Sequence, residues 1–466
     1  MTAAVGIDIG TTNTKVVRFD RGSSTTVLTR PTPTRLDDLL AVVFAGIRAA
    51  AVTGPVAAVG IASMAESGFP LDQRGRALTS MLSWRDTRDD ADVHALADRL
   101  GADALFEATG VRPGPKPSLA VWLWLRSRHP ASFAAMHRWA GVADAVHLAL
   151  TGELRTDHTL AGRTLAYRLP PAGTPLAAVF DAGLLAEAGL RPEQLPRVAR
   201  PGDAPATTGS AIEGLAGGTP VVVAGHDHQV ASWATGVRDV GQVADSVGTA
   251  EAMLNLVRRV PDRPAVRAHG MSVVRAIDGR TEALLAGTGA AGGFLQQLAD
   301  DHTDGDVDRL LDGCDTATPA TGSWLLPYPA GRQCPEPDPR ARLRTVGSPG
   351  HLGLAALESL AYQAQWVLDV QATLAAQPVA AISLTGGPLH RNPLWARIKA
   401  TQAGVPTHLG GVTEPVAAGA AMLALHRAGL DDPPPLPNTT IEPLPGLRDA
   451  YRNRLAGFIA SARQPG

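Results

Sequence analysis

The chain has 466 residues, and its 42 Lys and Arg residues against 44 Asp and Glu residues give a formal net charge of −2 at pH 7. Its length supplies material for two or three domains. With 45% hydrophobic and 18% charged residues, its composition is that of a compact folded protein rather than a disordered one. The balanced charge excludes the basic footprint of a dedicated nucleic-acid binder. Two cysteines, Cys314 and Cys334, exclude a disulfide framework and a four-thiolate zinc site.

The start of the chain carries no export signal. Met1 to Ala4 lead directly into a strand-like segment, without the basic and apolar regions of a signal peptide. Apolar runs elsewhere are interrupted well before the ~20 residues that cross a bilayer. We therefore expect a cytoplasmic protein whose partners are neither membranes nor nucleic acids. A homodimer is an oligomeric state that the sequence leaves open.

The first half of the chain is predicted to open with two strands. Val5, Ile7 and Ile9 alternate with other residues before a Gly-Thr-Thr-Asn turn, and a second strand follows to about residue 20. Apolar spacing predicts a helix over 36–53 and a buried strand over 56–63. Further helical patterns lie near 91–108, 119–127 and 141–151.

The second half repeats this opening. A buried strand over 220–224 is followed by an expected loop over 225–228 and a helix from residue 229. Strands over 243–246 and 252–257 then flank a Gly-Thr turn. Helices over 292–300 and 351–376 and a strand over 379–384 come later. The pattern predicts two α/β halves with a boundary near residue 240, giving domains 1–240 and 241–466.

The two glycine turns are candidate phosphate sites. A tight glycine turn presents successive backbone N–H groups as a concave anion nest, and Asp8 at the end of the first strand is suited to hold hydrated Mg²⁺. An ordinary hairpin with small turn residues is the alternative, which the combination of acid, glycine, hydroxyls and amide disfavours. The candidate phosphate contacts are Gly10, Thr11, Thr12 and Asn13 in the first turn, and Gly248 and Thr249 in the second.

Further motifs follow these turns in a characteristic order. They are Gly6–Thr12, Ser83–Arg88, Thr156–Leu165, Gly225–Asp227, Leu325–Arg332, Asp338–Ala341, His351–Glu358, Thr385–Gly387, Asn392–Trp395 and Glu414–Ala421. Each is weak alone, but their order and spacing resemble the FGGY family of carbohydrate kinases, and xylulokinase-like members in particular, over nearly the whole chain. A pair of phosphate-binding hairpins is also characteristic of the wider actin, Hsp70 and sugar-kinase ATPase superfamily.

The resemblance implies an α/β protein of two ribonuclease H-like (actin-like ATPase) domains with a nucleotide and substrate cleft between them. It implies ATP and Mg²⁺ as cofactors, with Asp8 at the metal. Asp227 matches the catalytic Asp of the family. A carboxylate there accepts the proton of the attacking hydroxyl, because an alcohol does not ionise near neutral pH. A simple helix cap is the alternative role for Asp227.

The resemblance also implies a nucleotide site in the second half. Its candidate residues are Gly292, Gln296, Gly386, Gly387 and Asn392. The family usually has a third glycine where this chain has Pro388.

The acceptor site departs from the relatives. Glu66 stands where xylulokinase-like members have histidine, and glycerol kinases resemble the chain there but place arginine where it has Ala65. A carboxylate accepts hydroxyl hydrogen bonds and repels an acidic sugar. We therefore expect a neutral ketose or polyol, with a pentulose first and glycerol, a tetritol or another sugar as alternatives. Candidate contacts are Glu66, Trp84, Asp227 and His228, unless Glu66 instead pairs with an arginine such as Arg85.

Three competing interpretations concern the same residues. Residues 287–292 match G-x-G-x-x-G, but no second strand follows to complete a dinucleotide-binding unit. His226 and His228 are expected on opposite sides of an extended segment, which disfavours a shared zinc ion. From another functional class, a non-sugar actin-like or Hsp70-like ATPase shares the hairpins, but the order of the sugar-kinase motifs favours a kinase.

Overall fold

The computed structural model describes residues 3–314 and 323–464, which form two compact units. The sequence analysis proposes one boundary near residue 240, whereas each unit is assembled from separate stretches of chain. Unit 1 comprises Met1–Gly236, Val273–Glu282 and Glu414–Leu436, and unit 2 comprises Val237–Ser272, Ala283–Thr413 and Pro437–Gly466.

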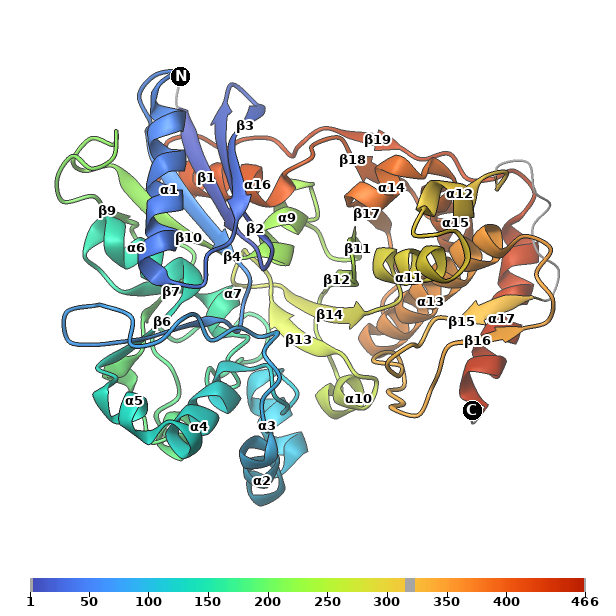
Figure 1. Ribbon diagram of the computed structural model, residues 1–466, viewed down its shortest axis with the longest axis horizontal. Helices are drawn as coiled ribbons and strands as arrows, with labels where there is room; N and C mark the ends of the chain where they lie inside the picture. The colour runs from blue at the N-terminus through green and yellow to red at the C-terminus, as the bar shows by residue number, and fades with distance from the viewer. Residues whose placement is uncertain (1–2, 315–322, 465–466) are drawn as a thin grey trace. The chain divides into compact units, whose positions relative to one another are not determined.

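Unit 1 is built on a six-stranded sheet of order β3-β2-β1-β4-β10-β9 (Figure 1). β1 is antiparallel to β2 and parallel to β4, and β10 is also parallel to β4. The predicted strand-turn-strand opening is therefore confirmed. The strands of the unit are β1 (Ala4–Ile9), β2 (Asn13–Asp20), β3 (Ser23–Pro31), β4 (Ala58–Ser63), β5 (Gly68–Leu71), β6 (Arg138–Gly141), β7 (Arg155–Asp157), β8 (Arg197–Ala199), β9 (Ala206–Thr207), β10 (Pro220–His226) and β13 (Ser272–Arg275).

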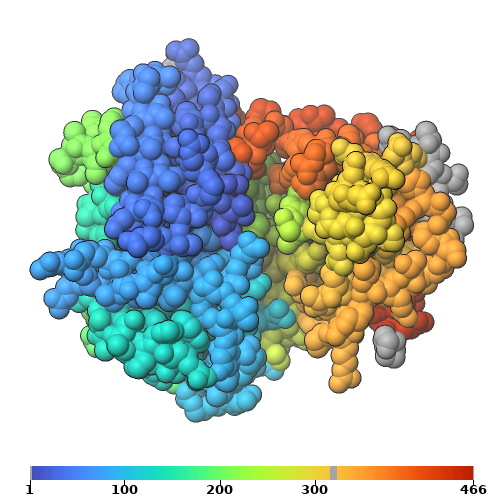
Figure 2. Space-filling model, viewed as in Figure 1, coloured from blue at the N-terminus to red at the C-terminus, as the bar shows by residue number. Residues whose placement is uncertain are grey.

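The helices of unit 1 are α1 (Leu36–Ala51), α2 (Ala91–Leu100), α3 (Ala102–Thr109), α4 (Ser118–Arg128), α5 (Pro130–Ala135), α6 (Val142–Thr151), α7 (His158–Ala161), α8 (Ala182–Glu187), α9 (Asp227–Ala234) and α16 (Pro415–Arg427), with a 3-10 turn, η1 (Pro192–Gln194). Of these helices, α1, α6, α9 and α16 pack against the six-stranded sheet, whereas α2, α3 and α4 contribute to a second core. α1 buries Leu39, Val43 and Ile47 on one stripe, as its apolar spacing predicts. In Figure 2 the blue atoms of the N-terminal stretch, including α1, lie on the surface of unit 1.

Alternate residues of β1 and β4 face two different layers. Val5, Ile7 and Ile9 pack in one core with the buried stripe of α1, as the two-residue period of a strand requires. On the other face, α16 lies so close that a Cβ on Gly6 would be 1.8 Å from the carbonyl oxygen of Ala417, and one on Gly60 would be 1.8 Å from that of Ala420. Glycine is therefore required where the helix crosses the two strands.

Unit 2 is built on a sheet whose central order is β14-β12-β11-β17-β18-β19. β11 and β12 form the predicted second hairpin, and β17 runs parallel to β11. The strands are β11 (Gln242–Val247), β12 (Glu251–Val257), β14 (Glu282–Thr288), β15 (Trp324–Leu326), β16 (Arg344–Val346), β17 (Ala381–Thr385), β18 (Thr407–Gly410) and β19 (Asn438–Thr440).

The longest helix of unit 2 spans the strongest helical pattern of the sequence. His351 is the N-cap of α13 (Leu352–Ala375), and its side chain accepts a hydrogen bond from the backbone N–H of Leu354. The other helices are α10 (Arg263–Ala268), α11 (Gly292–His302), α12 (Val307–Leu311), α14 (Gly387–Arg391), α15 (Pro393–Ala403) and α17 (Arg448–Arg463). No helix within residues 3–314 and 323–464 is long and apolar enough to cross a membrane.

Replacing Gly60 with alanine should destabilise unit 1, because the added methyl group would overlap the backbone of α16. Overpacking of a tight interior costs about 1–3 kcal/mol, so Gly60→Ala should lower the unfolding midpoint by several degrees in a thermal denaturation experiment. Gly209→Ala is the matched control, since nothing lies within 4 Å of the position its Cβ would take. Equal midpoints for the two variants would contradict the close packing of α16.

Candidate functional site

Three parallel strands of unit 1 end at one edge of the sheet. The register pairs Ile9 of β1 with Ser63 of β4, and Ser63 with His226 of β10. Asp8 precedes the end of β1, and Asp227 follows the end of β10. Ligands of open α/β sheets bind beyond the carboxyl ends of the strands. This edge is therefore the candidate active site of unit 1.

The segment before Asp227 differs from the predicted loop. β10 continues through His226 and α9 begins directly at Asp227, so no loop separates them. Gly225 has φ +133°, and a Cβ there would lie 2.4 Å from Oγ1 of Thr159. The backbone N–H of His226 donates to the same Oγ1 at 2.9 Å. Thr159 therefore fixes the direction in which the chain delivers Asp227.

Thr159 is held in turn by a buried ion pair. Asp157 accepts hydrogen bonds from the backbone and side chain of Thr159, and Arg427 of α16 donates to Asp157 at 2.9 Å and to the carbonyl oxygen of Val223 at 3.0 Å. Although burial opposes ionisation, the neighbouring His158 and Arg427 hold the pKa of Asp157 well below its usual range. The pair ties α16 to the end of β10.

Asp8 is the buried acid of the first hairpin. Its residue is 8% exposed, and its Oδ1 has no hydrogen-bond partner among the described residues. Burial, and next the charge of Asp227, raise the pKa of Asp8 to about 8, while Lys15 opposes the shift. Lys15 is itself bound to Glu414 at 2.6 Å. An unpartnered buried carboxylate oxygen facing a second carboxylate fits a divalent cation.

Asp227 lies between two imidazoles. Its Oδ1 is 3.2 Å from Nε2 of His226 and 3.9 Å from Nε2 of His228. The two rings lie 5.3 Å apart, edge to face, so the expectation that they point to opposite sides is wrong. The strand ends at His226, and the helical turn that follows brings His228 back toward it. Burial, against the opposing charge of Asp227, lowers the pKa of His226 to about 3.

Glu66 is paired with an arginine, but not with Arg85. Its Oε1 accepts from Nη2 of Arg163 at 2.8 Å, and its backbone has φ +64°, an uncommon conformation for a residue with a side chain. Nε and Nη1 of Arg163 are buried and have no hydrogen-bond partner among the described residues. The pair thus offers both a carboxylate acceptor and unused N–H donors.

Trp84 connects the first hairpin to the Glu66 loop. Its indole N–H donates to Oγ1 of Thr11 at 3.0 Å, and its backbone N–H donates to Oγ of Ser67 at 3.1 Å. Lys116 lies 4.9 Å from the centre of its ring. The hydroxyl of Thr11 is thereby engaged inside unit 1, whereas Thr12 at the tip of the turn is exposed.

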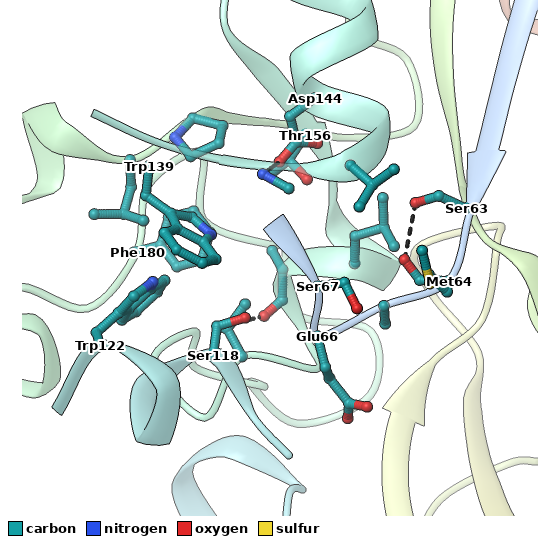
Figure 3. A pocket seen from close by; sticks show the side chains of 18 residues that line it. Ser63, Met64, Glu66, Ser67, Ser118, Trp122, Trp139, Asp144, Thr156 and Phe180 are labelled. Atoms are coloured by element: carbon teal, nitrogen blue, oxygen red, sulfur yellow. Dashed lines mark hydrogen bonds between the residues drawn. The ribbon is translucent and has the colours of Figure 1, made fainter. Parts of the chain in front are cut away.

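A small cavity lies behind the Glu66 loop. Its volume is about 30 Å³, room for one or two water molecules and far too small for a sugar. Figure 3 shows Trp122, Trp139, Phe180 and Asp144 around it, with the carboxylate of Glu66 turned away from Asp144. This cavity is therefore a feature of the core behind the site and not the acceptor pocket.

Three glycine-rich segments meet in unit 2. The backbone N–H groups of Gly292 and Gly293 donate to the carbonyl oxygens of Gly248 and Thr249 at 3.0 and 2.9 Å. Gly386 has φ +122°, and a Cβ there would lie 1.8 Å from the carbonyl oxygen of Val247. The structure thus brings together the predicted residues Gly248, Thr249, Gly292, Gly386 and Gly387.

The other two predicted nucleotide residues have structural partners. Gln296 is exposed on α11 and donates to Asp300 and to the carbonyl oxygen of Gly305, both at 3.0 Å. Asn392 caps α15 by accepting from the backbone N–H of Trp395 at 3.1 Å. Pro388 stands in the first turn of α14, where its missing N–H costs nothing because that group has no helical partner.

The acids of the second hairpin form a buried triad. Nζ of Lys399 on α15 lies 2.8 Å from Asp245 and 2.5 Å from Glu251. Burial, with the charge of Asp245, raises the pKa of Glu251 above its usual range, although Lys399 opposes the shift. Asp245 is therefore neutralised by a lysine, although its Oδ1, like that of Asp8, has no hydrogen-bond partner among the described residues. The lysine beside Asp8 in the first hairpin, Lys15, is instead bound to Glu414.

Comparison with known proteins places the chain in a family. Residues 40–234 match the N-terminal domain of the FGGY family of carbohydrate kinases, and residues 246–428 match its C-terminal domain. The chain belongs to the FGGY carbohydrate kinases. It is therefore a sugar kinase, of a family whose members are phosphotransferases with alcohol acceptors.

Individual relatives of this FGGY kinase differ in their named substrates. It is 28% identical to a glycerol kinase of Trichlorobacter lovleyi, over 91% of this chain and 90% of that one. It is also 28% identical to a xylulose kinase of Streptomyces rubiginosus, over 81% and 76%. The gluconate kinase structure from Lactobacillus acidophilus superposes with a TM-score of 0.86 at 21% identity, covering 100% and 99%. The actin-like two-domain fold is thereby confirmed, and the acceptor is left open.

The sequence analysis of this FGGY kinase missed four charged residues. Arg163, Lys399 and Arg427 pair with Glu66, Asp245 and Asp157 respectively, and Lys15 pairs with Glu414. In all four pairs the partners are more than 90 residues apart in the chain, so periodicity carries no sign of the pairing. Only the placement of Arg163 inside the family-like motif Thr156–Leu165 could have drawn attention to it.

Removing Lys399 should destabilise unit 2. Lys399→Met would leave Asp245 and Glu251 buried without a counter-ion, and breaking a buried pair in this way costs about 3–5 kcal/mol. Chemical denaturation should show the loss. Adding Asp245→Asn and Glu251→Gln to the Lys399→Met variant should recover part of it, because the uncompensated charges disappear. Destabilisation of less than about 1 kcal/mol by Lys399→Met would refute the triad.

Asp144 should make the stability of unit 1 depend on pH. Burial raises the pKa of Asp144 to about 7, whereas the unfolded chain releases that proton near 4. The folded state thus holds an extra proton between these values, and its stability falls as pH rises from 4 to 7.

Asp144→Asn should remove this cost, because asparagine stays neutral and its amide oxygen can still accept from the N–H of Gly141. In thermal unfolding experiments, the midpoint of the variant minus that of the wild type should increase as the pH rises from 5 to 8. A difference that is constant with pH would contradict the raised pKa.

Proposed function

We propose that this FGGY kinase transfers the γ-phosphate of ATP to a hydroxyl group of a neutral ketose or polyol, with a pentulose such as xylulose as the first candidate. The observation that carries the proposal is that Asp8 and Asp227 lie at the carboxyl ends of β1 and β10, which flank β4 in the sheet of unit 1. The carboxylate of Asp8 is suited to bind a metal ion, and that of Asp227 is suited to accept a proton.

Asp227 is the proposed general base. It stands at the start of α9 with its Oδ1 close to two imidazoles, and it is partly exposed while its neighbour His226 is buried. A carboxylate so placed takes the proton of the acceptor hydroxyl as the new P–O bond forms, and the β-phosphate oxygen of the nucleotide leaves with the bonding electrons. The buried Asp157–Thr159 pair holds the strand end that carries this base.

Asp8 is the proposed contact to Mg²⁺, through water. Its unpartnered buried Oδ1 fits a cation, and when bound the ion offsets the charge of the phosphate oxygens. Thr12 and Asn13 of the first turn are proposed phosphate contacts through their backbone N–H groups, with Thr11 positioned by Trp84. Gly10, whose own N–H donates to the carbonyl oxygen of Asn13 at 3.1 Å, is a proposed contact because glycine permits close approach to the phosphate.

The nucleotide is proposed to bind unit 2 at its glycine cluster. Gly248, Thr249, Gly292, Gly386 and Gly387 meet there, and glycine permits the close approach of backbone to a phosphate or an adenosine. Gln296 and Asn392 remain proposed contacts that must first release their present hydrogen bonds.

The acceptor is proposed to meet the Glu66–Arg163 pair, Trp84 and His228. The ion pair balances its own charge, with Glu66 accepting and Arg163 donating hydrogen bonds. A polyhydroxyl acceptor both donates and accepts, so it matches this pair without bringing a net charge. Glycerol or a tetritol is the second candidate, because Glu66 occupies the position at which glycerol kinases carry the same residue.

The test is a coupled assay of ADP release over ketoses, polyols and sugar acids. We expect acceptor-dependent release with a neutral ketose or polyol, and little with gluconate. Asp227→Asn should lower turnover at least a hundredfold, since general-base catalysis is typically worth 10²–10⁴, while ATP binding is retained. Asp37→Asn, exposed on α1, is the control. Full turnover by Asp227→Asn would refute its role, and absence of acceptor-dependent release would refute the proposed activity.

A further inference from the structure

His226, Asp227 and His228 form a cluster of potential metal ligands. One ligand atom from each residue lies within 4.8 Å of those of the other two. Asp227 Oδ1 is 3.2 Å from His226 and 3.9 Å from His228. Ligands around a tetrahedral zinc ion, at bond lengths of about 2.0–2.2 Å, lie roughly 3.3–3.6 Å apart. The His226–Asp227 distance is already close to that spacing, whereas His228 has to move nearer.

Independent observations support metal binding at this cluster. The imidazole of His226 is more than nine-tenths buried and holds its Nε2 3.2 Å from Oδ1 of Asp227. His228 is the opposite case, with a side chain 42% exposed, so it is free to turn toward an ion arriving from solvent. The cluster thus combines a fixed imidazole, a carboxylate and an adjustable imidazole.

We propose that His226, Asp227 and His228 bind Zn²⁺ or a similar divalent transition-metal ion, and that this ion reversibly blocks the kinase. The inhibition rests on the proposed role of Asp227, whereas the binding does not. An ion bound to the Asp227 carboxylate occupies the lone pair that has to accept the proton of the acceptor hydroxyl. Phosphate transfer then stops while the ion remains.

The ligand chemistry separates this ion from Mg²⁺. Magnesium prefers oxygen ligands and binds imidazole poorly, whereas zinc, copper and nickel accept it readily. Asp8 offers an unpartnered carboxylate oxygen, so the magnesium position and the transition-metal position share one neighbourhood but have different donors.

The surroundings indicate reversible rather than permanent binding. Resident zinc sites usually orient each histidine by a hydrogen bond to its other ring nitrogen, and Nδ1 of His226 lacks such a partner. The charge of Arg163 also acts on His226, although Glu66 partly neutralises that guanidinium. We therefore expect an affinity that responds to changes in free metal.

Direct binding is tested with Co²⁺ and the full-length protein without nucleotide. Titration should produce saturable visible absorption that Zn²⁺ displaces. His228→Gln and His226→Gln should each weaken Co²⁺ binding at least tenfold. His94→Gln is the matched control, because His94 is an exposed histidine 3.1 Å from Asp90, and its affinity should stay within twofold of wild type. An affinity of His228→Gln within threefold of wild type would overturn the site.

Inhibition is tested separately at fixed Mg²⁺ and ATP. Zn²⁺ should inhibit the wild type more strongly at low acceptor concentration, and inhibition of His228→Gln, relative to its own zinc-free rate, should need at least tenfold more Zn²⁺. Equal sensitivity of both proteins would overturn the inhibitory site. A protein that binds Co²⁺ through these histidines but phosphorylates no acceptor would refute the proposed function alone. An active kinase with unchanged Co²⁺ affinity in His228→Gln would refute the metal site alone.

Discussion

The candidate site of unit 1 depends on the close approach of α16 to β1 and β4. Gly6 and Gly60 leave no side chain between the sheet and the helix, and the helix backbone fills that space. Each end of α16 carries an ion pair. Glu414, just before the first turn, pairs with Lys15, and Arg427, in the last turn, pairs with Asp157. A segment more than 400 residues from β1 in sequence thereby fixes the charges around the strand ends.

Charge is handled differently in the two glycine hairpins. Asp245 is neutralised by Lys399 in a buried triad, so it serves the packing of unit 2. Asp8 has a buried oxygen without a partner, and the neighbouring acid raises its pKa. An arrangement of this kind is unfavourable without a cation. The two hairpins look alike in sequence, yet their lysines have different partners. Lys399 pairs with Asp245, whereas Lys15, opposite Asp8, pairs with Glu414, so the first hairpin is the better suited to a metal ion.

The carboxylate of Asp227 is the point at which activity and regulation meet. The same lone pair is proposed to accept a proton during transfer and to bind a transition metal when one is present. This follows from His226 and His228, whose imidazoles both lie close to Oδ1 of Asp227 because a strand changes into a helix between them. An extended segment through residues 226–228, as the sequence analysis expected, would have put the two imidazoles on opposite sides. Glu66 shows the same principle, since Arg163 rather than Arg85 defines the charge it presents.

The sequence alone determined the two glycine hairpins, the principal strands and helices, and membership of the FGGY kinases. These depend on local alternation, turn chemistry and the order of motifs along the chain. Tertiary structure decided which charged groups meet: Arg163 with Glu66, Lys399 with Asp245, Arg427 with Asp157, and His226 with His228. Most of these pairs join residues far apart in the chain, and the last depends on where a strand gives way to a helix. Periodicity records which face a residue occupies but not its partner, so only the packing of the sheet, α15 and α16 could show the electrostatics of the site.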